Sequence, residues 1–222
     1  MIKDKKELLS KKEALQVINL LEKEYGEKTT SLNYETDWQL LFATILSAQC
    51  TDKRVNKITR ILFKKYPSVR AMANANKEEL IKIIKPTGYY NSKAKYLIES
   101  SKLLVEKYNS KIPQTIKELI KLPGVGRKTA NIVLNYAHKI QEGIAVDTHV
   151  KRLSYRIGFT KNKNPEKIEK DLITLFDKTF WGKINSLLVT HGRKICTAKK
   201  PKCKECIINK ICLSAFKIRC SK

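Results

Sequence analysis

Apolar residues recur three or four positions apart along almost the whole chain, and this spacing gives a helix one apolar face. The first stripe ends at Tyr25, and Gly26 follows it as a C-terminal stop. Residues that cap helices, such as Thr51 and Asn76, precede later stripes. No convincing run alternates apolar and polar residues as a half-buried strand would. The sequence therefore predicts an all-α fold. The first stripe consists of Ala14, Leu15, Ile18, Leu21 and Tyr25.

No low-complexity linker divides the 222 residues, a length that allows one large domain or two modest ones. We expect one helical domain over 29–141 and a second formed by 1–28 plus 142–222. The N-terminal helix could pack on either. Further helices are expected after Thr36-Asp37 and over the segments 94–108, 115–122 and 129–137.

The formal net charge is +25, from 46 basic and 21 acidic side chains. Such an excess attracts polyanions and gives salt-dependent affinity for phosphate backbones. Only eight of the basic residues are arginine, so a lysine-rich genome composition is the alternative explanation. No apolar run is long enough to span a membrane, and the basic N-terminus lacks the apolar core of a signal peptide. We expect a soluble cytoplasmic protein, associated with the nucleoid if the source is bacterial.

Four of the six cysteines fall within 17 residues near the C-terminus. Such clustering in a chain without an export signal indicates a metal site in a reducing compartment. Four thiolates with one close pair can hold either a zinc ion or a cubane iron–sulfur cluster, and zinc more often uses two close pairs. Cys50 and Cys220 lie outside this group and are expected to be structural thiols. The four ligand candidates are Cys196, Cys203, Cys206 and Cys212.

A short glycine-containing connection joins two expected helices at Leu122-Pro123-Gly124-Val125-Gly126. Gly124 and Gly126 allow positive φ and a close approach of another backbone. The helix that follows begins with free amide N–H groups, and these, with the helix dipole, favour a phosphate. An ordinary turn between two helices is the alternative interpretation.

The segment Leu122–Asn131, with the sequence LPGVGRKTAN, resembles the helix-hairpin-helix of the endonuclease III family of DNA glycosylases. The cysteine cluster and three further segments extend this resemblance, in order, over nearly the whole chain. The resemblance implies a 4Fe–4S cluster on the four cysteines. It also implies a bifunctional DNA glycosylase and abasic-site lyase that acts as a monomer on double-stranded DNA containing oxidised pyrimidines or abasic sites. The three segments are Leu46–Gln49, Tyr90–Ala94 and Val146–His149.

The resemblance assigns catalysis to Lys128 and Asp147. Lys128 occupies the position of a Schiff-base lysine, and we expect partial desolvation and the helix's positive end to favour its neutral amine. Asp147 corresponds to the catalytic carboxylate, which would stabilise positive charge on the sugar or relay a proton. Taken alone, the pattern around Asp147 favours a helix N-cap.

Further residues are expected to touch DNA. An enzyme that acts on a base must flip it out of the duplex and fill the gap. The resemblance assigns this to Gln49 and to Tyr89, although the family usually has leucine at the second position, so the manner of filling is open. Gly124 and Gly126 would bind phosphate, as would the basic loop between the first two cysteines. That loop contributes Lys199, Lys200 and Lys202.

Two alternative functions remain to be weighed. A mismatch adenine glycosylase of the same superfamily typically lacks a lysine at position 128 and carries an extra C-terminal domain. A non-catalytic helix-hairpin-helix protein would explain the charge, the hairpin and the cysteines, but would not require both Lys128 and Asp147. His149 and His191 receive no role beyond packing or a phosphate contact.

Overall fold

The computed structural model describes residues 8–26 and 30–217, and every regular element in these ranges is helical. The all-α prediction is therefore confirmed. The described part of the chain contains no helix that is long and apolar enough to cross a membrane. The elements are α1 (Lys11–Tyr25), α2 (Asp37–Leu46), α3 (Asp52–Lys65), α4 (Val69–Ala73), α5 (Lys77–Ile84), η1 (Lys85–Thr87), α6 (Tyr90–Tyr108), α7 (Ile116–Leu119), α8 (Arg127–His138), α9 (Thr148–Ile157), α10 (Pro165–Leu175), α11 (Lys178–Lys194) and η2 (Cys203–Glu205).

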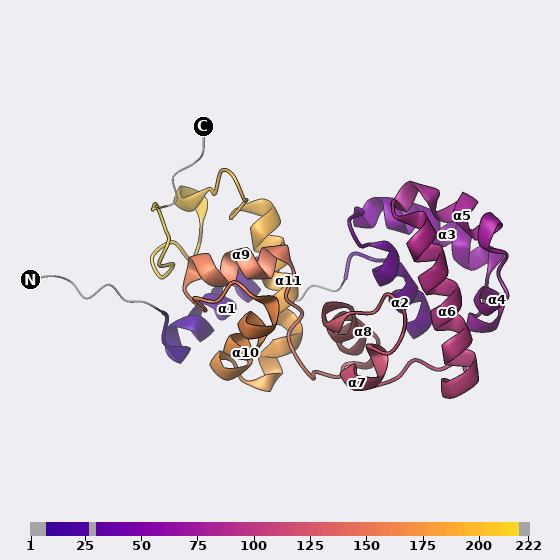
Figure 1. The fold of residues 1–222 in the computed structure, drawn as a ribbon. Coiled ribbons are helices and arrows are strands. Elements are labelled where there is room, and N and C mark those ends of the chain that lie inside the picture. Colours follow the sequence, from indigo (N-terminus) through magenta and orange to yellow (C-terminus); the bar gives the residue numbers. More distant parts are fainter. Residues whose placement is uncertain (1–7, 27–29, 218–222) are drawn as a thin grey trace, which may run out of the picture. The chain divides into compact units, whose positions relative to one another are not determined.

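The chain forms two compact units (Figure 1). Thr30–Glu142, here called the hairpin unit, contains α2 to α8. Met1–Thr29 together with Gly143–Lys222, here called the cysteine unit, contains α1 and α9 to α11. The domain boundaries expected from the sequence differ from these by one residue. The expected boundary at 28 and 29, and Cys220, lie outside the described residues.

Local capping explains where most of the helices begin. The hydroxyl of Thr51 accepts the Arg54 N–H, and the Asn76 side chain accepts the Glu79 N–H. α6 begins at Tyr90, four residues before the expected start, because the Tyr89 carbonyl already accepts the Lys93 N–H. α7 ends at Leu119, whereas the sequence predicted a helix that continues to Leu122. Proline disfavours helical backbone in the residue before it, so Pro123 acts against helix at Leu122.

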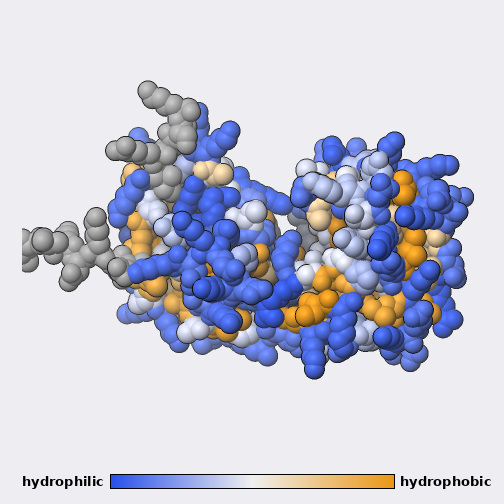
Figure 2. Space-filling view, viewed as in Figure 1, coloured by the Kyte–Doolittle hydropathy of each residue, from blue (hydrophilic) through white to orange (hydrophobic). Residues whose placement is uncertain are grey.

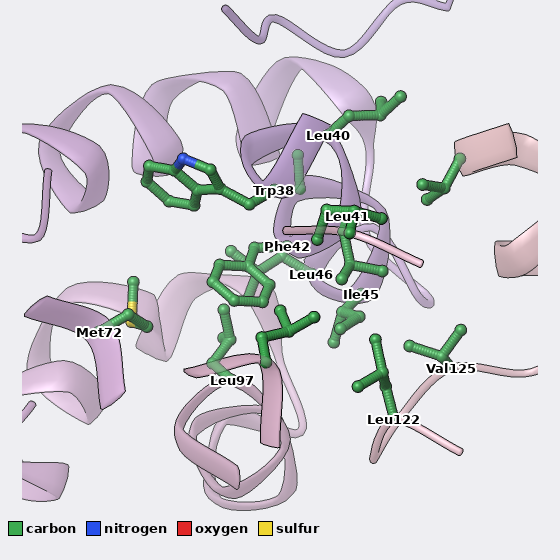
Figure 3. Packing of buried hydrophobic residues seen from close by; sticks show 14 of the residues in the cluster. Trp38, Leu40, Leu41, Phe42, Ile45, Leu46, Met72, Leu97, Leu122 and Val125 are labelled. Carbon is green, nitrogen blue, oxygen red and sulfur yellow. The ribbon is translucent and has the colours of Figure 1, made fainter. Parts of the chain in front are cut away.

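The core of the hairpin unit surrounds α2, whose residues from Trp38 to Leu46 are nearly all buried. Trp38 makes edge-on ring contacts with Phe42 and Phe63. Leu122 and Val125, which flank Pro123-Gly124 in the connection between α7 and α8, belong to the same core and lie near Ile45 of α2 (Figure 3). The hairpin is thus anchored to the central helix by apolar side chains at both ends of its turn.

The core of the cysteine unit includes α1, which packs against α11. Ala14, Val17 and Leu21 of α1 are fully buried in it. The N-terminal helix therefore packs in this unit. Hydrophilic residues cover most of the face shown in Figure 2, and apolar areas interrupt them on both units.

Candidate active site and cysteine loop

The turn between α7 and α8 lies directly against α6. Gly124 has a φ of 77°, and a Cβ atom there would stand 2.6 Å from the Tyr96 ring. The Ser100 hydroxyl donates a hydrogen bond of 2.8 Å to the Pro123 carbonyl. Glycine is therefore required at 124 by backbone conformation and by contact, whereas a Cβ at Gly126 would meet nothing within 4 Å.

The N-terminus of α8 has no side-chain cap among the described residues. Its first intrahelical hydrogen bond runs from the Ala130 N–H to the Gly126 carbonyl, 3.0 Å away, so the preceding amides project from the helix end. Gly126 itself is exposed. The arrangement suits an anion.

Lys128 lies in the first turn of α8, and its side chain is exposed. The expectation that this amine is partly desolvated is therefore wrong for the protein without DNA. The reason is geometric, because the buried face of α8 begins at Ala130 and Lys128 lies outside it.

Asp147 is the N-cap of α9, and its Oδ1 accepts the Val150 N–H at 2.8 Å. The capping role that the local pattern favours is thus present. Among the described residues its hydrogen bonds involve Oδ1 alone, so capping leaves Oδ2 available. Asp147 belongs to the cysteine unit and Lys128 to the hairpin unit.

Gln49 and Tyr89, the expected gap-filling residues, both lie in the hairpin unit with left-handed backbone, at φ of 54° and 48°. Both side chains are exposed, and Tyr89 retains 66% of its accessible surface. Gln49 lies in the connection between α2 and α3, and Tyr89 directly precedes α6. Left-handed backbone is uncommon outside glycine, so each segment must be held by its surroundings.

The four clustered cysteines of the cysteine unit line one cavity, together with apolar side chains that include Ile157 and Ile208. Burial first, and then the neighbouring thiols, raise the pKa of Cys212 to about 11. Four thiolates in this cavity would repel one another unless cations accompanied them, and this donor set suits an iron–sulfur cluster. Among the described residues, no group of three His, Cys, Asp or Glu side chains is spaced to hold a single metal ion.

His191 contacts this cavity from α11. Burial lowers the pKa of His191 to about 4, so its ring is neutral near pH 7. Its Nδ1 lies 2.8 Å from the Tyr25 hydroxyl and its Nε2 lies 3.4 Å from Cys206 Sγ. A tyrosine that donates to Nδ1 leaves Nε2–H directed at the sulfur. Sequence reasoning gave His191 no such contact.

Two arginines of α9 hold the basic loop between Cys196 and Cys203, here called the cysteine loop. Arg156 donates to the carbonyls of Thr197 and Ala198, at 2.7 and 2.8 Å. Arg152 donates to the carbonyl of Cys196 at 3.1 Å. Sequence reasoning missed both arginines. Their spacing of four residues on one helix was the available signal, although it does not identify carbonyl partners.

The three lysines of that loop are exposed, as a phosphate contact requires. Lys202, however, forms an ion pair of 3.4 Å with Glu205. Its charge is therefore partly compensated, which distinguishes it from Lys199 and Lys200. The expectation that the three lysines contribute equally to phosphate binding is therefore changed to two full contributions and one reduced one.

Comparisons with known proteins match these features. Residues 42–178 match the HhH-GPD superfamily of base excision DNA repair proteins. The chain is 46% identical over 211 residues to Endonuclease III of Synechocystis sp., covering 95% of this chain and 96% of that protein. Endonuclease III of Thermotoga maritima is 41% identical over 197 residues, covering 88% and 92%.

Solved structures agree with the sequence relatives. A trapped endonuclease III–DNA covalent intermediate superposes with a TM-score of 0.90 at 36% identity, covering 95% of this chain and 99% of that one. A thermostable thymine-DNA glycosylase has a TM-score of 0.83 at 24% identity, covering 93% and 98%, and shares the fold.

Proposed function

Because the chain belongs to the endonuclease III family, within the HhH-GPD superfamily of base excision DNA repair proteins, we propose that it removes oxidised pyrimidines from duplex DNA and then cleaves the strand. It is a base excision repair DNA glycosylase and abasic-site lyase, and DNA is its partner. The observation that carries the proposal is the match over 95% of the chain to an endonuclease III held covalently on DNA. A covalent intermediate requires a nucleophile, and Lys128 offers an exposed primary amine on the hairpin helix.

In the proposed reaction the Nζ lone pair of Lys128 bonds to C1′ of the deoxyribose. The bond from C1′ to the base nitrogen breaks, and the base leaves after taking up a proton. The adduct opens to an imine. Loss of a proton from C2′ then breaks the bond between C3′ and its oxygen and releases the 3′ phosphate. Water hydrolyses the imine and restores the amine. Since Lys128 is exposed, its amine is open to a bound strand.

Asp147 is proposed to serve as both cap and catalyst. Its Oδ1 is fixed by the Val150 N–H, which orients the carboxylate from the end of α9. Its Oδ2 can relay a proton in the reaction, and the negative charge stabilises positive charge that develops on the sugar. Capping therefore preorganises the catalytic group and does not compete with it.

Separate elements of the chain grip the DNA strand. The amides at Gly124, Gly126 and the start of α8 bind one phosphate, while Lys199 and Lys200, with a smaller share from Lys202, bind others. Gln49 and Tyr89 fill the space that the flipped base leaves. An exposed tyrosine at the start of α6 can stack on a neighbouring base, which replaces the usual aliphatic wedge by an aromatic one.

The four cysteines are proposed to hold a 4Fe–4S cluster. Cys196, two residues after the end of α11, and the three later cysteines would hold the cluster, which would compensate the charge of the four thiolates. Arg156 reinforces the first ligand, because its Nη1 lies 3.5 Å from Cys196 Sγ. We further propose that the protein acts as a monomer in the cytoplasm, at the nucleoid. Its bacterial-type relatives and its excess of basic residues support that location.

Borohydride trapping tests the proposed substrate class. One duplex carries thymine glycol, and a matched duplex of the same flanking sequence carries adenine opposite 8-oxoguanine. Borohydride reduces the imine to a stable amine, so we expect a covalent adduct and strand cleavage with the first duplex alone. Adenine release from the second duplex without an adduct would instead identify the adenine glycosylase alternative.

A further inference from the structure

Lys93 is a buried ammonium in the first turn of α6, with only 3% of its surface accessible. Its Nζ donates three hydrogen bonds, to the carbonyls of Leu46 and Ala48 at 2.9 Å and of Thr87 at 2.8 Å. An ammonium group has three donors, so every one of them is used. All of these residues belong to the hairpin unit.

The three acceptors connect two segments that are far apart in sequence. Leu46 ends α2, and Ala48 directly precedes Gln49. Thr87 lies two residues before Tyr89. A single cation therefore ties the backbone beneath Gln49 to the backbone beneath Tyr89.

Both segments need such a tie, because Gln49 and Tyr89 adopt left-handed backbone that their residue types disfavour. Burial lowers the pKa of Lys93, which shows that the charge is held at a cost in hydration. A methionine of similar length would avoid that cost, but it would leave the three carbonyls without this donor. The ammonium thus has a use that apolar packing does not supply.

We propose that Lys93 is a positioning residue that presets the two segments carrying the gap-filling side chains, so that Gln49 and Tyr89 enter the duplex together when a base is flipped. The inference rests on the proposed gap-filling function of these two residues. Lys93 is buried and does not touch DNA. It acts through the backbone of both segments, and its loss lowers affinity for damaged DNA while leaving phosphate contacts intact.

The test compares Lys93→Met with Lys102→Met, which removes the same charge from an exposed position on the same helix. Binding is measured on matched duplexes, damaged and undamaged, and 2-aminopurine beside the lesion reports unstacking. We expect Lys93→Met to weaken damage-specific binding at least about tenfold, the scale of one lost base stack. Undamaged DNA should be bound within about twofold of wild type, since phosphate contacts remain. Lys102→Met should keep both the preference for damage and the 2-aminopurine signal.

A double-mutant cycle separates positioning from general destabilisation. If Lys93 acts through the gap-filling side chains, Lys93→Met should add little further loss in the Gln49→Ala/Tyr89→Ala background. Full additivity, or an unchanged damage preference in folded Lys93→Met, overturns the proposal. If the methionine variant does not fold, the same binding measurements are made on Lys93→Gln, which keeps two donors on a shorter side chain. If Gln49→Ala/Tyr89→Ala itself keeps the preference for damage, the gap-filling function fails, which is a different result.

Discussion

The hairpin unit and the cysteine unit fix the loops that are proposed to bind DNA in different ways. In the hairpin unit, the segments that carry Gln49 and Tyr89 are fixed by the protein's own buried hydrogen bonds from Lys93. In the cysteine unit, α9 arginines hold the loop backbone, but the four cysteines share a cavity in which burial disfavours the thiolates that a metal needs. The hairpin unit needs only side chains of the protein for this purpose, whereas the cysteine unit is proposed to need a bound iron–sulfur cluster. Preorganisation thus comes from buried hydrogen bonds in one unit and from a proposed cluster in the other.

The largest expected effect breaks the chemistry of the hairpin unit without disturbing its packing. Lys128→Gln removes the primary amine, and because an imine cannot form without it, borohydride trapping and strand nicking should be abolished. The side chain is exposed, so the melting temperature should stay near that of wild type. Lys139→Gln, at the other end of α8, is the matched control and should retain activity. A persistent adduct in Lys128→Gln would point to another nucleophile.

The next effect concerns the cysteine unit and separates two roles of one side chain. Asp147→Asn keeps an oxygen that can accept the Val150 N–H but removes the charge. We expect base release to fall at least about a hundredfold, the scale of losing an acid–base or electrostatic group, with little change in stability. Single-turnover kinetics and thermal melts measure the two quantities. Wild-type activity with a lowered melting temperature would show that Asp147 serves only as a cap.

A smaller effect is expected when the contacts that hold the cysteine loop, and with it the proposed iron–sulfur cluster, are weakened. Purified without air or chelator, the protein should be yellow-brown and contain iron and acid-labile sulfide. Arg156→Lys keeps the charge but loses the planar pair of donors to Thr197 and Ala198. We expect iron release to a chelator to be about tenfold faster, as for other groups that orient metal ligands. Arg193→Lys, at the exposed end of α11, is the control. A colourless, fully active protein with stoichiometric zinc would contradict the cluster.

The sequence predicted the elements that local chemistry determines. Thr51 and Asn76 cap helices as expected, because a cap and its amide partner lie within three residues. Lys93 and Arg156 escaped prediction because their partners are backbone carbonyls far away in sequence, and any lysine or arginine can donate to a carbonyl. The roles of Lys128 and Asp147 came from the family resemblance, since neither exposure nor a helix cap distinguishes a catalytic residue.

The smallest expected effect asks whether the cysteine loop touches phosphates or only adds to the bulk charge. Changing Lys199, Lys200 and Lys202 to Ala should lower the slope of log affinity against log salt by about two units, at ~0.9 per phosphate contact on B-form DNA. The value is two and not three because Lys202 is already paired with Glu205.

The control for that experiment removes the same charge from α10 and the segment just before it, by changing Lys163, Lys167 and Lys170 to Ala. All three are exposed, and Figure 1 places α10 well away from the cysteine loop. This variant should leave the salt slope near that of wild type. The loop variant should lose affinity almost equally for damaged and undamaged duplexes, since phosphate contacts carry no base information. Tyr89→Ala should do the opposite, weakening damage-specific binding with little change in slope. Equal slopes for both triple variants would mean that the net charge of +25 attracts DNA without a contact at this loop, and the cysteine unit would then need another surface for the strand.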